Sequence, residues 1–227
     1  GATGNVGSCL ARRLVTLGHE VTILCRATSD RRALGDTPRR EVIGDLTQAA
    51  PVREACRGQE VVVHVGAVIS YRQRDAAKMY EANVLGTRNV VEGCLAGGVR
   101  RLVHTSSVAA VGIPRADRPA NETLGFHRDA RRIGYFRTKW EAEQEVWSGV
   151  ARGLDAVAVN PGVIWGGSIG LNSARLLRRT ALGRLPFIIP GGVTVVDVED
   201  VVEGHLLALD RGRRGERYIL GSEMLLW

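Results

Sequence analysis

The sequence of 227 residues has little lysine, few aromatic residues and no long apolar run. Lys78 and Lys139 are its two lysines, so arginine carries almost all of the positive charge behind a net charge of +7. The arginines are dispersed and are not interleaved with aromatic side chains, which make up 5% of the chain. The charge therefore does not predict a nucleic-acid surface, and no apolar run reaches the length that spans a membrane.

The sequence also lacks any clustering of cysteine. Cys9, Cys25, Cys56 and Cys94 are scattered, with no Cys-x-x-Cys pair and no Cys/His cluster. We therefore predict neither a metal site nor a disulfide framework, and this cysteine usage fits a reducing cytoplasm. With 44% hydrophobic and 24% charged residues, the composition is typical of a soluble globular protein of one large domain, or of one with a small appendage.

Apolar strand patterns alternate with amphipathic helix patterns along the chain, which is typical of a parallel sheet with right-handed crossovers. Several strand patterns are continuous Val, Ile and Leu runs, as in strands that are buried on both faces. The predicted strands are Val21–Cys25, Glu41–Ile43, Val61–Val65, Arg101–Thr105, Ala156–Asn160 and Val193–Val196. The predicted helices are Val6–Leu17, Ala49–Cys56, Ala76–Ala96, Gly134–Ala151, Ser173–Leu182 and Val198–Leu209.

The first seven residues form a glycine-rich turn ahead of a helix pattern, with glycine at positions 1, 4 and 7. Glycine allows a tight bend, a close approach of the backbone to a pyrophosphate and close packing of strand on helix. The helix that follows directs its free N–H groups at the phosphates. Because a strand pattern comes after the helix, the turn predicts a dinucleotide site.

The chain begins inside this motif, with no strand to feed the turn, and it ends at Trp227 without a closing helix or polar tail. We interpret it as a fragment that is truncated at both ends. In a doubly wound fold, the strand that belongs before the turn would lie between Val21–Cys25 and Val61–Val65.

Two further segments carry residues that are suited to catalysis. Tyr135 and Lys139 are four positions apart on a predicted helix, so they share one face. An ammonium group near a phenol stabilises the phenolate and lowers the pKa of the tyrosine. Thr105, Ser106 and Ser107 end a predicted buried strand, where ligands of open α/β sheets bind. A hydroxyl group there can hold a substrate oxygen, and one of the two serines is also expected to cap the next turn.

These motifs together resemble those of the extended short-chain dehydrogenases/reductases, in the NAD-dependent epimerase/dehydratase group. Within that group the chain is most similar to dihydroflavonol 4-reductase-like proteins and hopanoid-associated sugar epimerases. The matching motifs follow the family order over essentially the whole chain. They are Gly1–Gly7 with its two residues between the first two glycines, Gly44-Asp45-Leu46, Asn83–Thr87, Thr105–Ser107, Tyr135 with Lys139, Asn160-Pro161-Gly162 and Asp197–Val201.

The resemblance implies an α/β fold with a doubly wound parallel sheet of the Rossmann type and a small C-terminal substrate cap, whose first strand is missing from the chain. Residues 1–165 would form the NAD(P)-binding Rossmann domain and residues 166–190 a segment of the cap. Residues 191–212 would return to the Rossmann domain, and residues 213–227 would begin a second, truncated cap segment.

The resemblance also implies residue roles. Tyr135 would be the general acid/base, Lys139 would lower its pKa and bind the nicotinamide ribose, and Ser107, with Ser106 as the alternative, would bind the substrate oxygen. Asn83 matches a family asparagine, for which a structural hydrogen bond is the simpler role. The residues expected at the cofactor are Gly1, Thr3, Gly4, Asn5, Val6, Gly7, Arg26, Asp45, Leu46, Val65, Gly66, Ala67, Thr105, Tyr135, Lys139, Pro161, Gly162 and Val163.

The second predicted strand ends in Cys25-Arg26, where NAD enzymes place an acidic residue that binds the ribose 2′-hydroxyl. An arginine suits a 2′-phosphate through bidentate, charge-assisted contacts, and Arg31 or Arg32 could add to it. We therefore expect NADP(H), with NAD(H) as the alternative. A surface arginine in an arginine-rich chain is the competing explanation.

The expected activity is hydride transfer between a nicotinamide and a carbonyl or hydroxyl carbon of a small substrate, as in a dihydroflavonol reductase-like ketone or aldehyde reductase. A nucleotide-sugar epimerase or dehydratase would use the same triad. A non-catalytic NADP-binding redox sensor is the alternative from another class, although such proteins commonly lack the Tyr/Lys pair. Family members often form dimers through two long helices, which correspond to residues 76–96 and 134–151.

Overall fold

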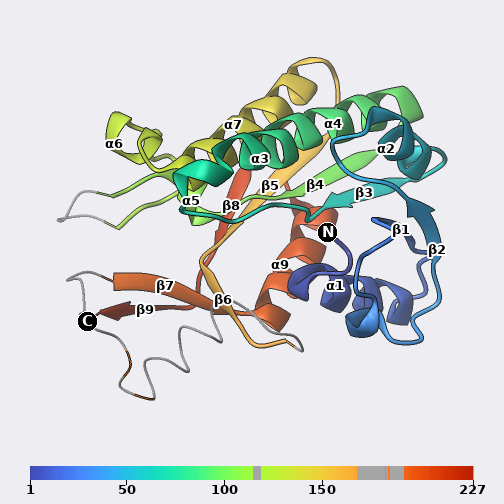
Figure 1. Ribbon diagram of the computed structural model, residues 1–227, viewed down its shortest axis with the longest axis horizontal. Coiled ribbons are helices and arrows are strands. Elements are labelled where there is room, and N and C mark those ends of the chain that lie inside the picture. The colour runs from blue at the N-terminus through green and yellow to red at the C-terminus, as the bar shows by residue number, and fades with distance from the viewer. Residues whose placement is uncertain (115–118, 168–181, 183, 185–191, 227) are drawn as a thin grey trace.

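The computed structural model describes residues 1–114, 119–167, 182, 184 and 192–226 (Figure 1). Its main sheet has four strands that all run parallel, in the order β3-β4-β5-β8. Its two central strands are almost entirely buried, which explains the apolar patterns of the sequence there. The strands are β3 (Val61–His64), β4 (Arg101–Thr105), β5 (Ala156–Pro161) and β8 (Arg217–Leu220).

Two further strands, β1 (Thr22–Cys25) and β2 (Arg40–Ile43), form a parallel pair of their own. Among the described residues, neither of them is hydrogen-bonded as a strand to β3. The glycine-rich turn lies between this pair and the main sheet, and α1 (Asn5–Thr16) continues from it (Figure 1).

The C-terminal strands of the chain belong to two different sheets. A small separate sheet contains β6 (Val163–Trp165), β7 (Gly192–Asp197) and β9 (Glu223–Leu226), so β7 does not return to the main sheet. Residues 213–227 were expected to begin a cap segment, but within them β8 pairs with β5 and completes the main sheet. In the sequence, β8 shows only the three-residue apolar run Tyr218-Ile219-Leu220 after Arg217, which is shorter than the runs that mark the other buried parallel strands.

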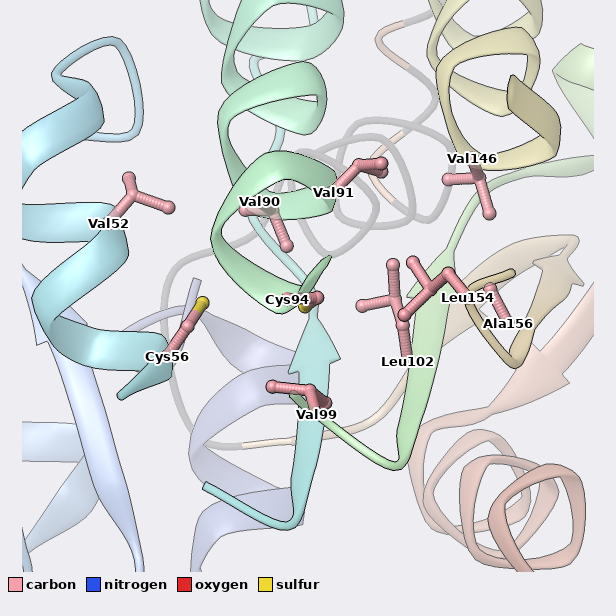
Figure 2. Close-up of a cluster of buried hydrophobic side chains, with 10 residues drawn as sticks. All are labelled: Val52, Cys56, Val90, Val91, Cys94, Val99, Leu102, Val146, Leu154 and Ala156. Carbon is pink, nitrogen blue, oxygen red and sulfur yellow. The ribbon is translucent and has the colours of Figure 1, made fainter. Parts of the chain in front are cut away.

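Helices cover both faces of the main sheet, as the doubly wound fold requires (Figure 1). On one face, α2 (Ala49–Cys56), α4 (Gly86–Gly97) and α7 (Gly134–Ala151) bury a core with residues of β4 and β5 (Figure 2). On the other face, α9 (Val198–Arg211) packs on β4 and β5 and contacts α1.

The helix predicted over Ala76–Ala96 is interrupted. The structure divides it into α3 (Ala76–Met79), a π-helical segment η3 (Tyr80–Leu85) and α4. A π-helical turn shifts the face that later residues present, and such turns are frequent at functional sites. Short elements complete the description, namely η1 (Arg32–Leu34), η2 (Gln73–Asp75), α5 (Val108–Val111) and α6 (Arg128–Arg131).

Several expectations concern the chain as a whole. The helix expected over Ser173–Leu182 lies outside the described residues, apart from its last position. All four cysteines are buried and free. In the described ranges, no helix is long and apolar enough to cross a membrane. The same ranges hold no group of three or more residues that could bind a metal ion.

Candidate active site

The candidate site lies where the parallel strands of the main sheet end. Residues 65–67 follow β3, residues 106–107 follow β4, and residues 162–163 follow β5. Because these carboxyl ends meet at one edge of the sheet, segments that are far apart in the sequence come together there. The glycine-rich turn reaches the same edge, since Gly1 is packed against Val65 and Gly66.

The turn is packed too closely for any side chain at two of its glycines. A Cβ on Gly1 would lie 2.5 Å from the backbone nitrogen of Gly66, and a Cβ on Gly7 would overlap the carbonyl oxygen of Gly1. The first turn of α1 has no side-chain cap and no acidic residue. Its N–H groups therefore remain available to an anion, and this cradle fits the pyrophosphate of a dinucleotide.

Asp45 and Leu46 come to the cradle from the segment after β2. The side chain of Leu46 covers Gly66, whose added Cβ would lie 2.5 Å from the Cδ1 of Leu46. Asp45 accepts hydrogen bonds at 3.0 Å from both the backbone and the hydroxyl of Thr47. This carboxylate is thus fixed in a local turn, while Leu46 forms an apolar wall beside the glycines.

Asn83, in the π-helical segment, fixes the loop that follows residues 65–67. Its Oδ1 accepts from the backbone N–H of Val68 at 2.7 Å, and its Nδ2 donates to the carbonyl of Val68 at 2.9 Å. The same amide donates to Thr138 on α7 at 3.2 Å. These hydrogen bonds give Asn83 the structural role that was expected for it.

Tyr135 and Ser107 face each other at the end of β4. Burial raises the pKa of Tyr135 to about 12, and a hydrogen bond with the Ser107 side chain acts in the opposite direction. Ser107 also caps α5, where its Oγ accepts from the backbone N–H of Ala109 at 3.2 Å. Ser106, the alternative, is buried, and its hydroxyl has no hydrogen-bond partner in the described part of the chain.

Lys139 lies one helical turn after Tyr135 on α7. It is buried, and its Nζ donates to the backbone carbonyl of Thr105 at 2.9 Å. Burial lowers the pKa of Lys139 to about 8, while Glu143 raises it. The side chain of Thr105 is turned to the other face, where its hydroxyl lies 2.6 Å from Nε2 of His205.

The segment after β5 packs against the small sheet. Gly162 donates to the carbonyl of Leu220 at 3.0 Å, and a Cβ on it would overlap the carbonyl oxygen of Thr194. Val163 begins β6 and pairs with Val195. The turn joins the same region, since Asn5 donates to the carbonyl of Gly166 at 3.1 Å.

The arginines after β1 differ in whether their guanidinium groups are already ion-paired. Arg31 is ion-paired with Glu41 at 2.8 Å, and Arg32 is ion-paired with Asp30 at 2.6 Å. Arg26 is exposed, and within the described ranges its side chain has no hydrogen bond or ion pair. If Arg31 or Arg32 bound a 2′-phosphate, it would have to break its existing ion pair. Arg26 could bind the phosphate without breaking any contact in the described part of the chain.

The structure adds to this site four residues that the sequence did not single out, namely His205, Glu143, Arg217 and Tyr71. His205 supports Thr105, and Glu143 forms a buried cluster with Asn160 and Arg217. Tyr71 lies edge-on to Tyr135, with ring centroids 6.0 Å apart. The position of Glu143, one helical turn after Lys139, was the one available signal, because it places a carboxylate on the face of the two catalytic candidates.

Comparison with known proteins decides the family. The model of the NAD dependent epimerase/dehydratase family matches residues 1–221. The chain belongs to this family. That membership confirms the predicted resemblance, the doubly wound fold and the prediction of an NAD(P)-dependent type of enzyme.

Two curated relatives are similar over almost the whole chain. The sterol demethylase protein B of Methylococcus capsulatus is 38% identical over 98% of this chain and 68% of its own length. A protein of Synechocystis sp. named "Putative dihydroflavonol 4-reductase" is 37% identical over 98% of this chain and 66% of its own length. The chain thus spans about two thirds of the length of these epimerase/dehydratase-family relatives.

A solved structure of the family shows the same architecture. The UDP-glucose 4-epimerase of Thermus thermophilus, determined as a complex with NAD, has a TM-score of 0.83 and is 26% identical. The match covers 100% of this chain and 78% of that one.

Proposed function

We propose that this member of the family is an NADP(H)-dependent oxidoreductase that moves hydride between the nicotinamide and a carbonyl or hydroxyl carbon of a small substrate. The observation that carries the proposal is the hydrogen bond between Ser107 and Tyr135, beside the buried Lys139 and at the edge that also holds the glycine cradle. A proton donor, a second hydroxyl and a fixed cation are what carbonyl reduction requires of the protein.

The cofactor supplies or accepts the hydride when it is bound, and the side chains handle the oxygen. Ser107 binds and orients the substrate oxygen, and Tyr135 gives its proton to that oxygen as negative charge develops there. A phenol whose pKa is raised by burial to about 12 remains protonated at neutral pH, as the acid of a reduction must be. Lys139 provides the positive charge that opposes the phenolate left behind.

The residues proposed to hold the cofactor come from the glycine-rich turn and from the segments that follow β1, β2, β3, β4 and β5. The turn and the start of α1 take the pyrophosphate, Asp45 and Leu46 lie beside the adenine, and Arg26 binds the 2′-phosphate of NADP(H). The backbone at Val65, Gly66 and Ala67, together with the segments at Thr105 and Pro161–Val163, lines the rest. The expected 2′-phosphate contact rests on Arg26 alone, because it is the unpaired arginine described at the end of β1.

The surface beside Tyr135 favours an apolar substrate. Tyr71 is 74% exposed, and its ring stands edge-on to Tyr135, while Ile69 in the same loop is 54% exposed. Large apolar side chains left at the surface near a catalytic group are typical of binding sites for apolar ligands. We therefore propose a ketone or aldehyde with an apolar or aromatic body.

A nucleotide-sugar epimerase is the second candidate, and the likeness to an NAD-bound UDP-glucose 4-epimerase favours it. The buried pair of Tyr135 and Lys139 argues against a purely sensory NADP-binding protein, because such a protein needs no proton donor. We also propose a cytoplasmic location, which the four free cysteines fit.

A homodimer through α3–α4 and α7 remains a proposal. Trp147 and Val150, which were expected to offer an apolar surface on α7, pack against the buried core of α2, α4 and α7. Ion pairs of Arg88 with Glu145 and of Arg152 with Glu92 join α4 to α7 along their outer side. A second subunit would therefore meet a largely charged surface on these helices.

One assay tests the proposed function. The protein is mixed with NADPH and, separately, with ketones, aldehydes and nucleotide sugars, while absorbance at the nicotinamide band and product composition are followed. Steady consumption of NADPH with a ketone or aldehyde supports the reductase. Isomerised sugar without net consumption of cofactor supports the epimerase, and no turnover together with tight NADPH binding supports the sensor.

A further inference from the structure

The helix that carries Tyr135 and Lys139 also carries a buried carboxylate that the catalytic scheme does not use. Glu143 follows Lys139 by one helical turn, and 1% of its side chain is exposed. Burying an ionised carboxylate is costly unless charge or hydrogen bonds compensate it. Both oxygens of Glu143 have such partners, and the partners come from strands β5 and β8.

The first partner ties Glu143 to the catalytic serine. Asn160, at the end of β5, is fully buried, and its Nδ2 donates to Oε1 of Glu143 at 2.6 Å. The same amide donates to the backbone carbonyl of Ser107 at 2.9 Å. One side-chain amide thus bridges the carboxylate and the main chain of the residue that hydrogen-bonds Tyr135.

The second partner is a cation that reaches in from β8. The Nη1 atom of Arg217 lies 3.3 Å from Oε2 of Glu143. Its Nε donates to the carbonyl of Glu122 at 2.9 Å and its Nη2 to that of Leu124 at 2.8 Å. The guanidinium therefore also fastens the segment between α5 and α6, which leads into the start of α7.

The other ionisable groups around Lys139 carry no compensating charge. His104 on β4 and His64 on β3 are buried, and burial lowers the pKa of both, so they remain neutral near pH 7. His205 on α9, which contacts Thr105, is kept neutral in the same way. Tyr135 is protonated near neutral pH, so Glu143 is the charge that acts on Lys139.

We propose that Glu143 is a positioning residue of the catalytic site. Its carboxylate balances the charge of Lys139 and, through Asn160, fixes the main chain at Ser107. Arg217 binds the same carboxylate and so determines how strongly the negative charge of Glu143 acts on Lys139. The proposal rests on the catalytic role proposed for Lys139. Its consequence is that the protonation of Lys139 responds in opposite directions to the loss of Glu143 and to the loss of Arg217.

The shortage of lysine allows a direct test that needs no substrate. Protein labelled with [ε-¹³C]lysine should give two carbon signals, from Lys139 and from the exposed Lys78 as the internal reference. The Lys139 signal is titrated in the wild type, in Glu143→Gln, in Arg217→Gln and in the double variant. Its pKa should fall in Glu143→Gln, because a raising influence is removed, and should rise in Arg217→Gln, where the carboxylate is no longer shared.

The double variant separates charge from folding. Removing one member of a buried pair leaves an uncompensated charge and is strongly destabilising, whereas removing both is often tolerated. The double variant should therefore regain much of the thermal stability lost in Arg217→Gln, yet keep the lowered pKa of Lys139. Once the reaction is identified, the reduction rate should fall at high pH, where Lys139 loses its proton. In the double variant, this fall should begin at a lower pH than in the wild type.

Two results would overturn the proposal. One is a Lys139 titration that is the same in all four proteins, and the other is a double variant that recovers both stability and the wild-type titration. Failure of the proposed function would look different, because NADPH oxidation would be absent from the wild type while the lysine titrations still moved in opposite directions.

Discussion

Arg31 is bound to Glu41 at 2.8 Å, on the strand beside the one that ends at Cys25. Because this pair is already formed, Arg26 is the arginine available to a 2′-phosphate at that strand end. The proposed preference for NADP(H) therefore depends on the side chain of Arg26, and a single substitution tests it.

Replacing Arg26 with alanine should weaken NADPH binding much more than NADH binding. Hydrogen bonds to charged groups contribute about 1.5–3 kcal/mol, which corresponds to a loss of roughly 10–100-fold in NADPH affinity. Fluorescence titration with both nucleotides measures the difference. Arg32→Ala is the matched control, since Arg32 is held by Asp30. Equal losses for the two nucleotides in Arg26→Ala would remove Arg26 from cofactor selection.

Replacing Tyr135 with phenylalanine should slow the reaction without disturbing cofactor binding. The change keeps the buried ring and removes the proton that a general acid supplies, a contribution of about 10²–10⁴-fold in rate. Steady-state kinetics with the identified substrate and a parallel NADPH titration provide the measurement. Phe136→Leu tests the neighbouring ring, which packs against Tyr135 without a hydroxyl. A Tyr135→Phe enzyme within a factor of about 3 of wild type would exclude Tyr135 as the acid.

Replacing Gly7 with alanine should abolish tight dinucleotide binding. The added Cβ would meet the backbone of Gly1 and Ala2, which cannot move aside as a flexible side chain could, so the cradle must open. Gly125→Ala is the control, because a Cβ there meets nothing within 4 Å. Calorimetric NADPH titration and thermal melting of both variants make the comparison, and unchanged affinity in Gly7→Ala would contradict the location of the site.

Acid should destabilise the protein through three buried histidines. Burial lowers the pKa of His64 from 6.5 to about 3 and also lowers those of His104 and His205. The unfolded chain binds protons at these residues below pH 6.5 and the folded chain does not, so stability falls as the pH falls through that window. Each histidine contributes a slope of up to about 1.4 kcal/mol per pH unit.

Urea unfolding between about pH 7 and pH 4 measures this slope. His104 has no hydrogen-bond partner at either ring nitrogen among the described residues, so His104→Leu removes a titrating group without breaking a bond. That variant should show a shallower dependence on pH, and the exposed His19→Gln is its control. A slope that His104→Leu leaves unchanged would show that this imidazole is not kept neutral by folding.

The sequence predicted the elements whose local patterns are strong. The strand β4 and the helices α2 and α7 were located to the residue, because burial on both faces and helical periodicity both leave clear patterns. The π-helical segment was not foreseen, since a change of helix type at Tyr80–Leu85 depends on the packing of Asn83 against a distant loop. β8 was missed because its apolar run is three residues long and follows Arg217, whose partners on α7 and in the segment between α5 and α6 no periodicity encodes.

The same distinction holds for the candidate site. The glycine turn, Ser107, Tyr135 and Lys139 were identified by motif, and the structure brings them to one edge of the sheet. The direction in which Lys139 points was not predictable, because its Nζ donates to the backbone carbonyl of Thr105. That carbonyl comes within reach of Lys139 only in the folded arrangement of α7 and β4. Glu143 and Arg217, which are 74 positions apart, become partners only through the order of the strands.

The position of β8 after the other strands of the main sheet has a consequence for synthesis on the ribosome. Chains fold from the N-terminus as they emerge, and the glycine turn, Ser107, Tyr135, Lys139 and Glu143 all emerge well before Arg217. Until β8 has been made, Glu143 lacks its cation and β5 lacks one of its neighbouring strands. A nascent chain can therefore hold the glycine-rich turn while Glu143 acts on Lys139 without competition from Arg217, and the set of partners around Glu143 is completed only when β8 has been added.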